Sequence, residues 1–86
     1  MSEKPHIIRK QRKDAAMGSL PAAVNLGAEI RVARLNAGMT QEGLALVVGV
    51  GRSAIVDIEK GSSGTAIGTL IRILDALGKR IKVADR

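Results

Sequence analysis

The 86-residue sequence contains no cysteine and no aromatic residue, and it has a single histidine. Without cysteine there is neither a disulfide framework nor a cysteine-based zinc site, and this absence fits a reducing compartment. Without Phe, Trp or Tyr there is no platform on which unpaired bases stack, which argues against RNA-recognition and single-strand-binding modules. The core must therefore be built from aliphatic side chains and methionine.

Long apolar runs are also missing. No segment approaches the roughly 20 apolar residues that cross a bilayer, and the N-terminus lacks the apolar region of a secretory signal. We therefore expect a cytoplasmic protein with no membrane partner. A chain of this length forms one domain with a modest core, and such domains often gain stability by association.

Positive charge is concentrated at the two ends of the chain. Residues 1–14 hold five basic residues against two acidic ones, and residues 79–86 hold four against one, whereas residues 15–78 hold five of each. This distribution fits a polyanionic partner such as DNA. The alternative is that both ends are solvated tails that are kept basic for solubility. The candidate DNA contacts in the first segment are Arg9, Lys10, Arg12 and Lys13.

The stretch from Thr40 to Gly61 indicates two short helices joined by a tight turn. Thr40 is a favourable N-cap for a helix over residues 40–48, and Gly49 ends that helix. A second helix over residues 52–60 has one apolar and one polar face. This is the outline of a DNA-binding helix-turn-helix. The residues expected to be buried in the two helices are Leu44, Ala45, Val48, Ala54, Ile55 and Ile58.

Two further helices are expected around this motif. One runs from about Pro21 or Asn25 to Asn36 and is stopped by Gly38, and the other runs from about residue 65 to Gly78. Residues 1–20 form a basic, flexible N-terminal arm in which residues 7–17 have some helical potential. The expected buried residues are Leu26, Ile30, Ala33 and Ala37 in the first helix and Ile67, Leu70, Ile71, Leu74 and Leu77 in the last.

The segment Lys79–Ala84 has the alternation of a strand, because Ile81 and Val83 alternate with basic residues. One strand in a helical domain leaves its backbone donors and acceptors unpaired. We therefore expect the strand to pair with its copy in a second chain, with Ile81 and Val83 in the dimer interface. The predicted organisation is an arm (1–20), a helix-turn-helix domain (21–78) and a dimerisation strand with its tail (79–86).

The motif resembles the helix-turn-helix of the Xre or phage-repressor family. Residues 74–78, a Leu-Asp-Ala-Leu-Gly phrase followed at once by the short basic strand, resemble the HipB-type antitoxins. The resemblance implies a mainly α, lambda-repressor-like fold of four to five helices that dimerises. Gly51 departs from the pattern, since a serine or threonine cap is usual there. The residues that match are Thr40, Gln41, Leu44, Ala45, Gly49, Val50, Ile55, Glu59 and Gly61.

Three residues at the starts of the motif helices are candidate DNA contacts. Gln41 matches a family glutamine that meets a backbone phosphate, although it also suits an exposed helix start. Arg52 and Ser53 lie in the first turn of the recognition helix, which enters the major groove. There arginine pairs with O6 and N7 of guanine.

The rest of the polar face of that helix gives weaker indications. Val56 suits a thymine methyl group, although single surface valines are common. Asp57 either accepts a hydrogen bond from a cytosine amino group or repels phosphates. Lys60 is either directed at a phosphate or makes no DNA contact.

The resemblance also implies a structural ion pair between Arg34 and Glu59 rather than a catalytic pair. His6 lies in the arm, and no serine has a histidine to activate it, so the sequence supports no enzymatic activity. It indicates no metal site and no cofactor.

The sequence thus predicts a DNA-binding transcriptional regulator that binds a palindromic operator in double-stranded DNA as a homodimer. The closest resemblance makes it a HipB-like antitoxin that represses its own operon and binds a HipA-like kinase toxin. The alternatives are a solitary phage-type repressor and an interaction module that sequesters a protein without binding DNA specifically.

Overall fold

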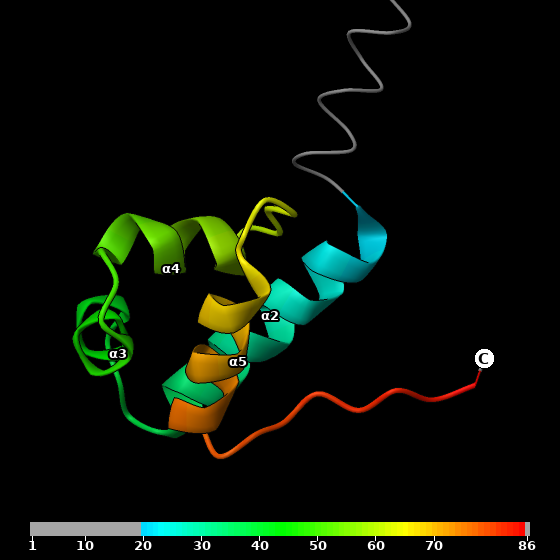
Figure 1. Cartoon of the computed structure of the whole chain (residues 1–86). Coiled ribbons are helices and arrows are strands. Elements are labelled where there is room, and N and C mark those ends of the chain that lie inside the picture. Colours follow the sequence, from blue (N-terminus) through cyan, green and yellow to red (C-terminus); the bar gives the residue numbers. More distant parts are fainter. Residues whose placement is uncertain (1–19, 86) are drawn as a thin grey trace, which may run out of the picture.

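The computed structural model describes residues 20–85 and contains four helices over that range (Figure 1). They are α2 (Pro21–Asn36), α3 (Gln41–Val48), α4 (Arg52–Glu59) and α5 (Ile67–Ala76). The fold class predicted from the sequence is confirmed, and each helix lies within a few residues of its expected position. The expected DNA contacts Arg9, Lys10, Arg12 and Lys13 lie outside the described residues.

The caps of α3 explain why this helix is so short. The side chain of Thr40 accepts a hydrogen bond from the backbone N–H of Gly43 at 2.9 Å, which satisfies a first-turn donor. At the other end Gly49 has a φ of 86°, a left-handed conformation that glycine adopts without a steric penalty. Both caps were predicted from the sequence, and both are confirmed.

The core lies where α3 meets α4 and α5, and α2 packs against α4 and contributes Ile30 to the core. Its four fully buried large side chains are all branched aliphatics, which fill the space that aromatic rings take in other small domains. The buried core residues are Ile30, Leu44, Ala45, Val48, Ile55, Ile58, Ile73 and Leu74.

Two glycines allow α2 to lie directly on the end of α4. A Cβ atom at Gly27 would come within 2.9 Å of the carbonyl oxygen of Glu59 and closer still to that of Ile58. Gly61 has a φ of 99°, and a Cβ there would lie 2.7 Å from Cγ2 of Val24. The backbones can therefore meet at this crossing only because both positions lack side chains.

Three residues expected in the core are exposed. Ala37 follows the last turn of α2 and faces solvent, and Ile67 and Ile71 of α5 are 69% and 44% exposed. Ile73, which was not expected to be buried, is fully buried instead. The prediction was wrong because apolar residues occupy more of the circumference of α5 than the neighbouring helices of one chain cover.

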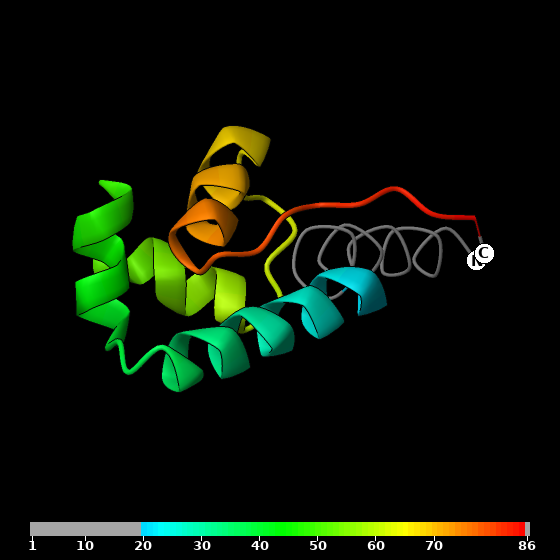
Figure 2. The same ribbon diagram turned by 90° about the horizontal axis from the view of Figure 1, so that it is seen from below.

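The expected strand is not formed within the described chain. Residues 79–85 have no regular secondary structure, and they lead away from the end of α5 and past the helices in both views (Figures 1 and 2). A strand is stable only when its backbone groups are paired. Pairing with a second copy therefore stays a prediction. None of the described helices has the length and apolar character needed to cross a membrane.

Candidate nucleic-acid interface

Helices α3 and α4 and the turn between them form a helix-turn-helix. The turn is fixed by two backbone hydrogen bonds from Gly49 and Val50 to the carbonyl oxygen of Ala45, at 2.8 and 3.0 Å. Half-buried Val50 packs against the core and anchors the turn. As a result, the first residues of the two helices, Gln41 and Arg52, lie within reach of each other: Nη2 of Arg52 is 3.5 Å from Oε1 of Gln41.

The outer face of α4 carries the side chains that were predicted to contact DNA. Arg52, Ser53, Asp57 and Lys60 are exposed, whereas Val56 is half-buried and offers only part of its surface to a ligand. Helix α4 starts at Gly51 without a side-chain cap, so no protein side chain caps its first-turn N–H groups. Such uncapped N–H groups are suited to an anion such as phosphate.

Arg34 of α2 and Glu59 of α4 form the ion pair behind this face. Nε of Arg34 donates to Oε2 of Glu59 at 2.6 Å, and Nη2 donates to Oε1 at 3.1 Å. The two side chains are only 7% and 3% exposed. The hydrogen bond to Glu59 raises the pKa of Arg34 above its ordinary value although burial acts in the opposite direction, so the guanidinium stays charged.

The ion pair has two further partners that were not predicted from the sequence. Nη1 of Arg34 donates to the carbonyl oxygen of Met39 at 2.8 Å, which ties α2 to the segment before α3. Nε2 of Gln41 donates to Oε1 of Glu59 at 3.2 Å. The pair therefore joins α2, α3 and α4. Residue spacing alone gave no sign of this link, because it depends on how the helices cross.

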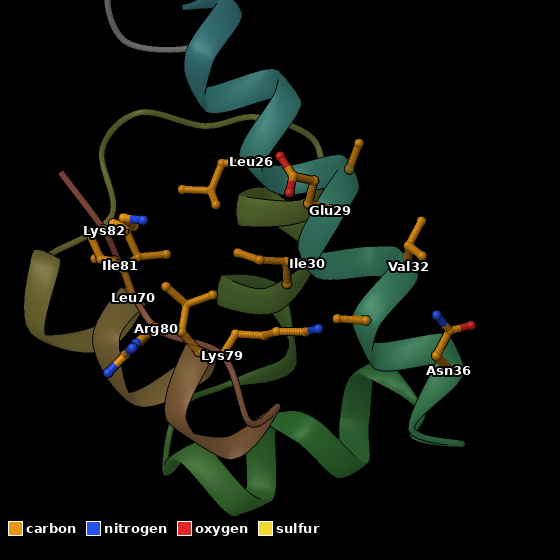
Figure 3. A pocket seen from close by; sticks show the side chains of 13 residues that line it. Leu26, Glu29, Ile30, Val32, Asn36, Leu70, Lys79, Arg80, Ile81 and Lys82 are labelled. Atoms are coloured by element: carbon orange, nitrogen blue, oxygen red, sulfur yellow. The ribbon is translucent and has the colours of Figure 1, made fainter. Parts of the chain in front are cut away.

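A second feature, a groove, lies between α2, α5 and the segment after α5 (Figure 3). Its volume is about 740 Å³, and its walls are mainly aliphatic. In the described part of the chain, no group of three or more His, Cys, Asp and Glu side chains could hold a metal ion. The labelled aliphatic residues along the groove are Leu26, Ile30, Val32, Leu70 and Ile81, and basic residues of the terminal segment lie at its edge.

Comparison with known proteins places this arrangement in a family. Residues 30–83, which include α3, α4 and α5, match the helix-turn-helix family. The chain belongs to this helix-turn-helix family. A curated relative, an HTH-type transcriptional regulator named y4mF of Sinorhizobium fredii, is 37% identical over 59 residues, which cover 69% of this chain and 78% of the relative. The family is a type of transcriptional regulator and not a family of enzymes.

Solved structures share the helix-turn-helix fold. A chain in a HipA–HipB–O2–O3 complex superposes with a TM-score of 0.69 at 24% identity, covering 78% of this chain and 94% of that one. A chain in a HipB–O1–O2 complex gives 0.68 at 24% identity, with 78% and 97% covered. The clp gene regulator ClgR from Corynebacterium glutamicum gives 0.63 at 28% identity, with 67% and 62% covered.

Proposed function

We propose that this helix-turn-helix protein is a cytoplasmic repressor that binds a palindromic operator as a homodimer through the outer face of α4. The observation that carries the proposal is the position of Gln41 and Arg52, which start the two motif helices and lie side by side on one surface. In this geometry the start of the second helix enters the major groove while the first helix meets the backbone.

Each candidate residue then has a distinct task. Gln41 contacts a phosphate, and Arg52 donates to a guanine edge, with Ser53 beside it in the first turn. Val56 and Asp57 meet bases further along α4, and Lys60 contacts a phosphate. The basic arm, with Arg9, Lys10, Arg12 and Lys13, adds affinity for any DNA sequence by neutralising phosphates.

The terminal segment supports the homodimer. Val83 is 94% exposed and Ile81 is 47% exposed, although both are apolar and Ile81 lines the groove beside α2 and α5. When this segment pairs with its copy, its backbone donors and acceptors form hydrogen bonds and both apolar side chains are covered. A dimer of this kind places two α4 helices about one DNA turn, roughly 34 Å, apart.

The antitoxin role rests on the resemblance of residues 74–84 to HipB-type antitoxins and on the likeness of the fold to chains from HipA–HipB and HipB complexes. On this proposal the protein represses its own operon and binds a HipA-like kinase encoded beside it. Co-expression of the chain with the products of its flanking genes tests this. Recovery of a stable complex with a kinase is expected, and its absence would favour a solitary phage-type repressor.

The operator proposal is tested by measuring binding to random DNA and to a duplex selected from the chain's own promoter. Arg52→Ala should weaken binding to the selected duplex by about 1–3 kcal/mol and relax preference at one base pair, with little change on random DNA. Equal weakening of binding to both duplexes would indicate that Arg52 contacts the DNA backbone rather than a base. Wild-type binding that never distinguishes the duplexes would favour the protein-sequestering alternative.

A further inference from the structure

The groove between α2, α5 and the terminal segment combines long aliphatic walls with positive charge at one edge (Figure 3). Its α2 wall extends from Leu26 to Asn36, which is about 15 Å of helix. Leu70 and Leu74 of α5 form the facing wall. The volume of about 740 Å³ and the mainly apolar lining are those of a site for a small molecule.

The end of α5 fixes the position of Lys79 at this groove. The backbone N–H of Lys79 donates to the carbonyl oxygen of Leu74 at 2.8 Å, and that of Gly78 donates to Asp75 at 3.0 Å. Gly78 has a φ of 72°, so the chain turns back as soon as the helix ends. In Figure 3 the side chain of Lys79 extends toward α2 and passes below Ile30.

The charges of the lining are unequal and lie apart. Three cations, Lys79, Arg80 and Lys82, belong to the terminal segment, whereas the one acidic side chain of the lining, Glu29, belongs to α2. The described part of the chain has one salt bridge, which joins α2 to α4 and includes none of these three cations. An anion is therefore attracted to the edge formed by the terminal segment and repelled near Glu29.

We propose that this groove binds a medium-chain aliphatic carboxylate, with the carboxylate at Lys79 and the alkyl chain along α2. Aliphatic walls favour an alkyl chain, because binding removes apolar surface of both partners from water. The lining has no aromatic ring on which a base could stack, and Asn36 is its one uncharged hydrogen-bonding side chain. This inference is independent of the operator binding proposed above, since no residue of α4 lines the groove.

The first test compares three probes that share either the chain or the head group. Decanoate is titrated into the full chain by calorimetry, below the concentration at which it forms micelles. Butyrate keeps the carboxylate without the long chain, and decyltrimethylammonium keeps the chain with the opposite charge. Circular dichroism at each decanoate concentration separates binding from unfolding.

Decanoate is expected to bind at one saturable site in each chain without changing the helical content. Each buried methylene group contributes up to about a fourfold change in Kd. Butyrate has six methylene groups fewer and should therefore show no saturable binding at the same concentrations. Decyltrimethylammonium should bind about fivefold more weakly than decanoate or worse, because it meets the three cations.

Two exposed positions of α2 provide a matched pair of variants. Val32 is 55% exposed and lines the groove, whereas Leu35 is 51% exposed and does not. Val32→Glu should weaken decanoate binding by about fivefold and reverse the preference toward decyltrimethylammonium, because it adds a negative charge to the wall. Leu35→Glu makes the same change on the same helix and should leave both Kd values unchanged. Thermal unfolding checks that both variants are folded.

A second pair of variants tests the head-group site. Lys79→Met keeps the length of the side chain but removes its charge, and it should weaken decanoate binding by about two- to fivefold. Binding of decyltrimethylammonium should be unchanged or tighter. Arg72→Met removes a positive charge from an exposed position of α5 outside the groove, and it should have no effect on either probe.

Three results would overturn the inference. Equal affinity of the wild-type chain for decanoate and decyltrimethylammonium would show unselective binding to apolar surface. Equal loss of decanoate binding in Val32→Glu and Leu35→Glu would place the site elsewhere. Decanoate affinity that falls as the protein concentration rises would show that a second copy of the chain occupies the groove.

Discussion

Arg34 is the one charged residue in the buried set of the described chain, at 6% exposure. Its guanidinium is satisfied on both sides, by the carboxylate of Glu59 and by the carbonyl oxygen of Met39. A buried ion pair adds little net stability compared with an apolar pair, but removing one partner leaves a buried charge uncompensated. The value of the pair to this fold is therefore the fixed crossing of α2 and α4.

The ion pair gives a prediction for stability. Arg34→Met should lower the free energy of unfolding by about 3–5 kcal/mol, because Glu59 loses its partner. The double variant Arg34→Met with Glu59→Leu should recover most of this loss, since it buries no charge. Urea unfolding followed by circular dichroism measures both. Arg31→Met, at an exposed position of the same helix, is the control, and a similar loss there would contradict the explanation.

Gly27 gives a second prediction, in which packing opposes helix propensity. Alanine is favoured over glycine inside a helix by about 1 kcal/mol. Even so, Gly27→Ala should destabilise the protein by about 1–3 kcal/mol, because its Cβ would press on the carbonyl oxygens of Ile58 and Glu59.

Gly68 of α5 provides the matched control, since a Cβ atom there meets nothing within 4 Å. Gly68→Ala should stabilise the protein by several tenths of a kcal/mol, up to about 1. Opposite signs in thermal unfolding at the two glycines are the expected result. If Gly27→Ala were also stabilising, α2 and α4 would not be in close contact in solution.

The helices were largely predictable from the sequence because their ends are chemically marked. Thr40 caps α3, and each of the four described helices is followed by a glycine with positive φ, at residues 38, 49, 61 and 78. Local signals of this kind act within a few residues, so a single sequence contains them.

What was not predictable depends on contacts between helices. Ile67 and Ile71 were expected in the core because they continue the apolar pattern of α5, yet they lie beyond the part of α5 that the core covers. The same reason explains the missed link between Gln41 and Glu59, two residues 18 positions apart. The spacing of apolar residues predicts that a face exists, but not which neighbour covers it.

The start of α4 gives a third prediction. Gly51 has an ordinary extended conformation, with φ −74° and ψ 155°, and a Cβ atom there has room. Gly51→Ser should therefore stabilise the protein by about 0.5–1 kcal/mol, by capping α4 and by restricting the unfolded chain. Gly51→Ala separates the two effects, because alanine also restricts the unfolded chain but has no side-chain oxygen to cap α4.

Gly49, two residues away, should behave in the opposite way. Its φ of 86° is unfavourable for any residue with a side chain, so Gly49→Ala should cost about 1 kcal/mol or more. Thermal unfolding of the three variants under one set of conditions checks the prediction. Stabilisation at Gly49 would mean that the turn between α3 and α4 differs from the one described.

The molecule as a whole leaves apolar side chains exposed on several of its elements. Ile67 and Ile71 of α5, Val32 of α2 and Val83 of the terminal segment are between 44% and 94% exposed, and Val32 lines the groove. A small domain gains stability from covering such surface. The proposed dimer covers the apolar side chains of the terminal segment, and the outer face of α4 is left for DNA.

The strand pairing in the proposed dimer has one favoured register. In an antiparallel pair of identical strands related by a two-fold axis, the residue numbers of every two facing residues add up to the same value, which is twice the number of the residue on the axis. The side chains of two facing residues lie on the same face of the sheet. Only an axis at Lys82 sets Ile81 of one chain opposite Val83 of the other, so that both apolar side chains have apolar partners. The same register sets the two Lys82 residues directly opposite each other, a like-charge pair.

This register gives the fourth prediction. Because the chain has no cysteine, Lys82→Cys introduces a single thiol. Opposite residues in an antiparallel pair have Cα atoms about 4.5–5.5 Å apart, within the range of a disulfide. Mild oxidation should therefore convert Lys82→Cys almost wholly into a covalent dimer on a non-reducing gel, and removing the lysine pair should tighten the dimer before oxidation.

Arg80→Cys is the control with the same chemistry at a different place in the strand. In the favoured register its two thiols lie four residue positions apart along the strands, about 14 Å, which no disulfide spans. It should stay monomeric on the gel although it dimerises in sedimentation. Efficient cross-linking at Arg80 rather than Lys82 would place the two-fold axis at residue 80, which shifts the pairing of the two strands by four residues. Failure of both, in a chain that sediments as a dimer, would show that the helices form the interface and leave the terminal strand to another partner.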